Sequence, residues 1–288
     1  MKKIFVGVIS IFSIITYAQN QRFSYEYKFV IDSTQKNQSE NEIMFLNVFS
    51  KGSQFYSKEV AESDSIMEAT IKKQANSGSM NINLSEVKSN GKVRYQIEKS
   101  YPDYSLSYFN KLGSDEYLVQ DSRNQNWKIL PDKEKIGDLM AQKATCSFAG
   151  RKWTAWFTTE IPIQDGPYKF HGLPGLIVKL EDQTKSHVFE LKGVKKLTDE
   201  HVFKSFKDKN RYKPLIVINE TKFKKVFLDN RDDPNKSARS MISQGMTFKM
   251  TDPSGKEIDM NQMMKDREKK QKEANKRNNN VLELDLLQ

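Results

Sequence analysis

The sequence is poor in the residues that build cross-links and metal sites. It has one cysteine, Cys146, and three histidines among 288 residues. A single cysteine excludes an internal disulfide and every metal motif made of paired cysteines. Free cysteine is usually a small buried hydrophobe, so we expect Cys146 in the core rather than as a reactive thiol. The fold must be held by packing, and we expect no metal and no cofactor.

Motifs that identify common enzymes are also missing. The chain has no Gly-x-Ser-x-Gly elbow, no phosphate-binding glycine loop and no His-Glu-x-x-His. His171 is the histidine best placed for chemistry, because Glu160 and Asp165 lie in the same connection. His187 falls on the inward face of a predicted strand, where a hydrogen-bonded core histidine is expected. We therefore lean against an enzyme and keep a hydrolase with a divergent site near His171 as a second alternative.

Long apolar runs are absent except at the start. Lys2 and Lys3 precede the charge-free run Ile4–Tyr17, and small residues at 16 and 18 suit a cut before Gln19. This is the pattern of a secretory signal peptide, and the run is shorter than the roughly 20 residues that span a bilayer. We expect an exported protein, periplasmic or secreted, whose mature chain has no transmembrane segment.

The charge balance is basic, with 47 Lys and Arg against 37 Asp and Glu and a net charge of +10. Removing Lys2 and Lys3 lowers this to about +8 and still favours acidic partners. Nucleic acid is excluded by the signal peptide, the scattered basic residues and the lack of a recognition motif. A lipid or other apolar ligand and an envelope protein remain as partners.

Alternating apolar residues predict strands in the N-terminal half. Arg22–Ile31 alternates with period two, and Glu42–Phe49 with Gln54–Glu59 forms a hairpin. Further strands are predicted at Val93–Lys99, Tyr104–Phe109, Glu116–Gln120 and Asn126–Leu130. Ala61–Gln74 has helical spacing instead. The sequence therefore predicts that the N-terminal half is an antiparallel meander with one helical interruption.

The centre of the chain combines three strands with a stiff loop. Strands are predicted at Arg151–Thr158, Leu176–Glu181 and His187–Val194. Period two places Trp153 and Trp156 on opposite faces of the first. The connection Glu160–Gly175, the proline loop, holds Pro162, Pro167 and Pro174, which fix φ. The structural turn comprises Gly172, Leu173, Pro174, Gly175, Leu176 and Ile177, and we predict a type II turn over residues 173–176.

The last third has a different character. Helices are predicted at Glu220–Leu228, Ser237–Ser243 and Ile258–Arg277. The last carries acid-base pairs four residues apart, which favours a solvated charged or coiled-coil helix over an anionic-lipid site. Val281–Leu284 then predicts a short strand at an edge of the sheet.

These motifs resemble a family. Residues 172–177 spell GLPGLI, the hexapeptide of the GLPGLI family of secreted proteins. The resemblance extends upstream through Gly150-Arg151, the run 153–157, Glu160-Ile161-Pro162, Gly166-Pro167-Tyr168 and Phe170. The ending 279–284 is similar to a family ending, with Val281 in place of proline. The resemblance implies an exported protein and no established activity. The strand order also resembles the half-barrel of lipoprotein-carrier proteins, which hold lipid chains.

The sequence therefore predicts a mainly β protein: one curved antiparallel sheet, a half-barrel or open barrel, with accessory C-terminal helices. The expected parts are 1–18 signal peptide, 19–200 sheet domain, 201–277 helical charged extension and 278–288 short strand or tail. The candidate ligand-binding residues are Arg151, Trp153, Trp156, Tyr168, Phe170 and His171. The expected function is non-enzymatic binding of an apolar or amphiphilic ligand. The first alternative is a ligand-free interaction protein that docks on an envelope partner.

Overall fold

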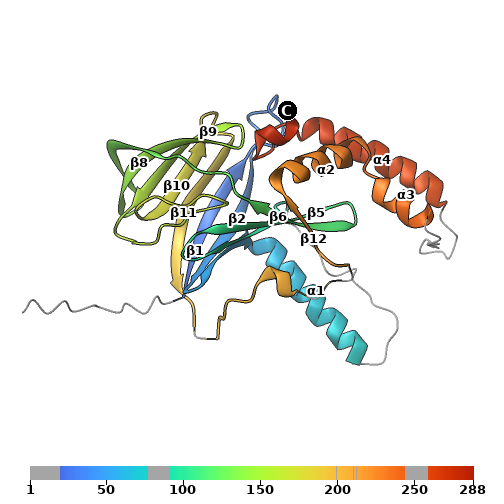
Figure 1. The fold of residues 1–288 in the computed structure, drawn as a ribbon, viewed down its shortest axis with the longest axis horizontal. Helices are drawn as coiled ribbons and strands as arrows, with labels where there is room; N and C mark the ends of the chain where they lie inside the picture. The colour runs from blue at the N-terminus through green and yellow to red at the C-terminus, as the bar shows by residue number, and fades with distance from the viewer. Residues whose placement is uncertain (1–19, 77–90, 199, 210, 212, 244–258) are drawn as a thin grey trace, which may run out of the picture.

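The computed structural model describes residues 20–76, 91–198, 200–209, 211, 213–243 and 259–288 (Figure 1). The predicted signal peptide lies outside the described residues. Twelve strands form one sheet in the order β12-β6-β5-β4-β3-β2-β1-β11-β10-β9-β8-β7. They are β1 (Gln21–Phe29), β2 (Glu40–Phe49), β3 (Gly52–Ser57), β4 (Gln96–Ser100), β5 (Ser105–Leu112), β6 (Asp115–Asp121), β7 (Lys128–Ile136), β8 (Leu139–Phe148), β9 (Arg151–Thr158), β10 (Leu176–Asp182), β11 (His187–Lys196) and β12 (Ile216–Asn219).

Strand β1 joins two arms of the sheet. It pairs antiparallel with β2 on one side and with β11 on the other. The first arm runs from β2 to β6 and β12, and the second from β11 to β7. Figure 1 shows the arms curving away from β1 without closing into a barrel. The prediction of a mainly β fold with one open, curved sheet is confirmed. All the pairings are antiparallel except that of β12 with β6.

Apolar alternation explains the register. Phe23, Tyr25 and Tyr27 of β1 point to one face and are buried, with Ser24 and Glu26 between them. In register, Phe23 faces Leu46 and Tyr25 faces Met44, both fully buried. The two arms thus share one continuous apolar core.

The helices are α1 (Lys58–Asn76), α2 (Glu220–Asp232), α3 (Lys236–Ser243) and α4 (Met260–Arg277), with short 3-10 turns at Phe206–Asp208 and Leu284–Leu287. The side chain of Asn219 caps α2, and that of Asp259 caps α4. Phe223 anchors α2 on the first arm against Tyr108 and Tyr117. Helix α4 packs on α2 (Figure 1). In the part of the chain that the structure describes, no helix is long and apolar enough to cross a membrane.

The prediction of a short strand at Val281–Leu284 is wrong. Residues 278–288, here called the C-terminal segment, run without strand pairing into a 3-10 turn. The carbonyl oxygens of Val281 and Leu282 accept from the Arg151 guanidinium instead of from a neighbouring strand. Strand β12 was also missed, and it lies inside the segment expected to be helical.

The turn before β10 differs from the predicted type II turn. The Gly175 N–H donates to Leu173 O (2.8 Å), and the Leu176 N–H donates across the loop to Ile161 O (3.0 Å). Gly175 has φ of +155°, and a Cβ there would lie 2.1 Å from Thr158 O. Glycine is required because the chain passes directly over the end of β9.

Candidate functional site

A cavity of about 650 Å³ lies between the sheet, helices α2 and α4 and the C-terminal segment. Its volume falls in the range of small-ligand pockets, about 300–1,000 Å³. Six aromatic residues line it and are called the aromatic floor: Tyr27, Phe29, Tyr95, Tyr108, Tyr168 and Phe227. Tyr27 and Phe29 come from β1, which both arms share, and Tyr95 comes from the segment before β4. The other three come from β5, the proline loop and α2.

Tyr95 gives the floor an unsatisfied polar atom. Its ring contacts Tyr108 and Tyr168, with ring centroids 5.7 and 5.2 Å apart. Its hydroxyl is buried and has no hydrogen-bond partner among the described residues. Burial raises the pKa of Tyr95 well above its ordinary value, so the phenol stays protonated. A buried donor without a partner is costly to leave, so this hydroxyl is a strained point of the floor.

His187 closes another side of the cavity as a neutral ring. Its Nε2 lies 3.0 Å from Asn280 O, which can only accept, so Nε2 carries the proton. Nδ1 then accepts from the Tyr27 hydroxyl at 2.7 Å. Burial, reinforced by Arg151, lowers the pKa of His187 to about 3. The prediction of a hydrogen-bonded core histidine is confirmed, and both nitrogens are occupied.

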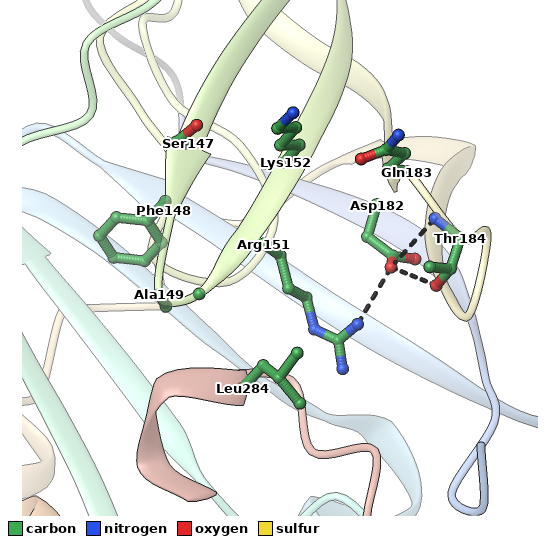
Figure 2. Close-up of a pocket in the computed structure, with 10 residues that line it drawn as sticks. Ser147, Phe148, Ala149, Arg151, Lys152, Asp182, Gln183, Thr184 and Leu284 are labelled. Carbon is green, nitrogen blue, oxygen red and sulfur yellow. Dashed lines mark hydrogen bonds and ion pairs between the residues drawn. The ribbon is translucent and has the colours of Figure 1, made fainter. Parts of the chain in front are cut away.

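Arg151 holds the C-terminal segment in place. Its Nε donates to Leu282 O (3.0 Å), Nη1 to Asp182 (3.0 Å), and Nη2 to Asn280 Oδ1 (2.7 Å) and Val281 O (2.6 Å). Figure 2 shows the guanidinium between Asp182 and Leu284. Arginine has five N–H donors, and these bonds use four of them. Arg151 was predicted to bind a ligand, but these bonds join it to the protein's own oxygens.

A second buried network fixes the same segment. Lys169 forms ion pairs with Asp121 (2.7 Å) and Glu283, and the Tyr168 hydroxyl donates to Glu283 (2.8 Å). Arg123 also forms ion pairs with Asp121 and Glu283. Burial pushes the pKa of Glu283 upward, but Lys169 and Arg123 bring it below its ordinary value. Glu283 is therefore charged, and its carboxylate oxygens already have partners in Lys169, Arg123 and Tyr168.

The proline loop has its own buried charge, Asp165. Lys99 pairs with it, and Ser53 and Tyr101 donate to it at 2.6 and 2.5 Å. Lys99 also donates to Phe170 O (3.0 Å). This network ties the loop to β3 and β4. Asp165 is fully buried, so it is not available to a substrate.

The surroundings of His171 show no catalytic pair. Burial lowers its pKa to about 4, and its ring stacks on Tyr104 with centroids 5.0 Å apart. Within the described residues, no hydrogen bond joins the His171 ring to Asp165 or Glu160. Glu160 is exposed and accepts from the Met140 N–H. The geometry around His171 gives no support to the hypothesis of a hydrolase.

The other predicted ligand-binding residues lie mostly in the core. Trp153 and Phe170 are buried against each other, with ring centroids 4.9 Å apart. Trp156 packs under the Lys179 ammonium on the opposite face of β9. Only Tyr168 of the six predicted residues lines the cavity. Cys146 is buried as expected, and burial raises its pKa to about 12.

Sequence reasoning missed the basic residues of the cavity. Five of them line it and are called the basic rim: Lys92, Arg94, Lys111, Arg231 and Arg267. They come from the segment before β4, from β5, from α2 and from α4, far apart in the sequence. No local spacing could have grouped them, because only the packing of α2 and α4 against the sheet brings them together.

Part of this chain matches a known protein family. A family model described as "Protein of unknown function (Porph_ging)" matches residues 123–179, which hold β7 to β9, the proline loop and part of β10. The comparison with curated proteins finds no significant match.

Two solved structures of PNGF-II match part of this chain. The one in space group P21 has a TM-score of 0.51 at 15% identity and covers 74% of this chain. The one in space group C2 has a TM-score of 0.49 at 17% identity with the same coverage. In both, the similarity spans 34% of the PNGF-II chain. At 15% identity, the likeness to the structure in space group P21 concerns the fold alone.

Proposed function

We propose that the protein is an exported, non-enzymatic binder that holds an apolar or amphiphilic ligand in the cavity between the sheet and helices α2 and α4. The observation that carries the proposal is the aromatic floor, whose Tyr95 hydroxyl lacks a partner among the described residues. Ligand sites are concave and mostly apolar, with a few polar groups that orient the ligand. Membership in the GLPGLI family, export through the signal peptide and a periplasmic or secreted location belong to the same proposal.

The first test is native mass spectrometry of the protein purified from the cells that produce it naturally. We expect a reproducible bound small molecule. Val281→Trp is the blocking variant, because Val281 lines the cavity and is partly exposed, so the indole would fill the space. Val202→Trp is the matched control, since Val202 is 64% exposed and lies outside the cavity.

Ligand loss in Val281→Trp alone, with unchanged melting of both variants, supports the proposal. Equal ligand occupancy in both variants contradicts it. An empty cavity with a stoichiometric protein partner would instead favour the interaction protein, for which the edge strand β7 offers unpaired backbone groups.

A further inference from the structure

Basic residues outnumber acidic residues in the lining of the cavity. The basic rim brings five Lys and Arg side chains to a cavity whose lining contains one carboxylate, Glu283. This gathering depends on the fold, since the five residues lie on four separate segments. Clefts lined by charge of one sign concentrate the field that attracts an oppositely charged ligand.

The single carboxylate does not neutralise the rim. Glu283 pairs with Lys169 and Arg123, neither of which lines the cavity. Lys92 has a surface partner in Glu40. Among the described residues, Lys111 and Arg267 have no carboxylate within the 4.0 Å of an ion pair.

Arg231 is the best-positioned member of the rim. Its Nη2 donates to the carbonyl oxygens of Asn275 and Asn278, the latter at 3.0 Å. Its guanidinium carbon lies 5.7 Å from the centre of the Phe227 ring. Those hydrogen-bond partners are neutral and orient the group, while the carboxylate of Asp232, the next residue, acts on its charge without an ion pair among the described residues. Within the described part of the chain, its Nε and Nη1 make no hydrogen bond. Arginine presents such donors in a planar fork that matches carboxylate and phosphate oxygens.

We propose that the ligand of this cavity is an anionic amphiphile, a carboxylate or phosphate on an apolar body. Arg231 and Arg267 bind the anionic group, and the apolar body lies on the aromatic floor. The inference rests on the proposed function, since it names the chemical class of ligand for the same cavity.

The test uses four probes with one twelve-carbon chain and different heads: dodecanoate, dodecyl phosphate, dodecanol and dodecyltrimethylammonium. Their affinities for the mature protein are measured by calorimetry at neutral pH, below the concentration at which each probe forms micelles. We expect both anions to bind about ten-fold or more tightly than dodecanol, and the cation most weakly. The ratio between the two anions distinguishes a carboxylate ligand from a phosphate ligand.

The paired variant is Arg231→Gln with Arg267→Gln. We expect it to lower the affinity for the anions to that for dodecanol and to leave dodecanol binding unchanged. The matched control is Lys225→Gln with Lys269→Gln, which removes the same charge from exposed positions of the same two helices outside the cavity. The control should keep the preference for anions.

The outcomes separate the two claims. Equal affinity for dodecanol and the anions overturns the anionic ligand while the cavity remains a binding site. An anion preference that survives in the paired variant overturns the assignment of Arg231 and Arg267 as the residues that bind the anionic group. If none of the four probes binds, the proposed function fails and this inference fails with it.

Discussion

The proline loop and helix α4 both carry charged residues, but they use them in opposite ways. Asp165 of the loop is fully buried and receives bonds from Lys99, Ser53 and Tyr101. Helix α4 has no buried residue among those described, and its Glu268–Lys272 pair lies at the surface. A buried charge must be satisfied by several directed bonds, whereas a surface pair competes with water and salt. The loop's charge therefore fixes its geometry, and the helix's charges do not.

The strongest way to test this contrast is to remove the buried carboxylate. We expect Asp165→Ala to lower the free energy of unfolding by about 3–5 kcal/mol, because it leaves the Lys99 ammonium buried without its counter-charge. Denaturant unfolding measures the change. The double variant Lys99→Met with Asp165→Leu should recover part of the loss, since it removes both charges. A cost below about 1 kcal/mol for Asp165→Ala would show that the loop does not depend on this pair.

Two glycines of the loop sharpen the comparison on a smaller scale. We expect Gly175→Ala to cost a few kcal/mol and Gly175→Val more, because any Cβ there meets Thr158 O. Gly172 has φ of +89°, but a Cβ there would have nothing within 4 Å. Gly172→Ala should therefore cost only about 1–2 kcal/mol of backbone strain. Thermal melting of the variants provides the ranking, and equal losses would mean that the contact with β9 is not what requires glycine at 175.

The smallest effect is expected on α4. Lys272→Gln removes the 2.7 Å pair with Glu268, in which the Lys272 side chain is 48% exposed. Exposed pairs contribute little to stability and are screened by salt. The midpoint of denaturant unfolding should not change resolvably at physiological salt. A loss comparable to that of Asp165→Ala would contradict the contrast between the two regions.

The same contrast explains what the sequence could predict. Large alternating side chains revealed β1, the β2–β3 hairpin and β9 to β11. Strand β8 was missed because its buried positions include Ala141 and Ala144, which give no strong apolar period. Strand β12 was missed because it is four residues long and exists through its parallel pairing with β6.

The candidate site was only partly predictable for a related reason. An arginine entering a buried strand needs oxygen partners, and Arg151 has them. Their identity was not accessible, because Asn280 lies 129 residues further along the chain. The cavity itself depends on how α2 and α4 pack on the sheet, which no local pattern encodes.

The seating of the C-terminal segment also affects the order of folding. The side chain of Asn280 donates to Val30 O across 250 residues (2.7 Å), and its carbonyl accepts from His187. Contacts between such distant positions close large loops, which costs conformational entropy. Strands β1 to β11 can pair beforehand, but Arg151 then lacks the oxygens of Asn280, Val281 and Leu282. We therefore expect docking of this segment to be a late step of folding, and the cavity to lack one wall until it has occurred.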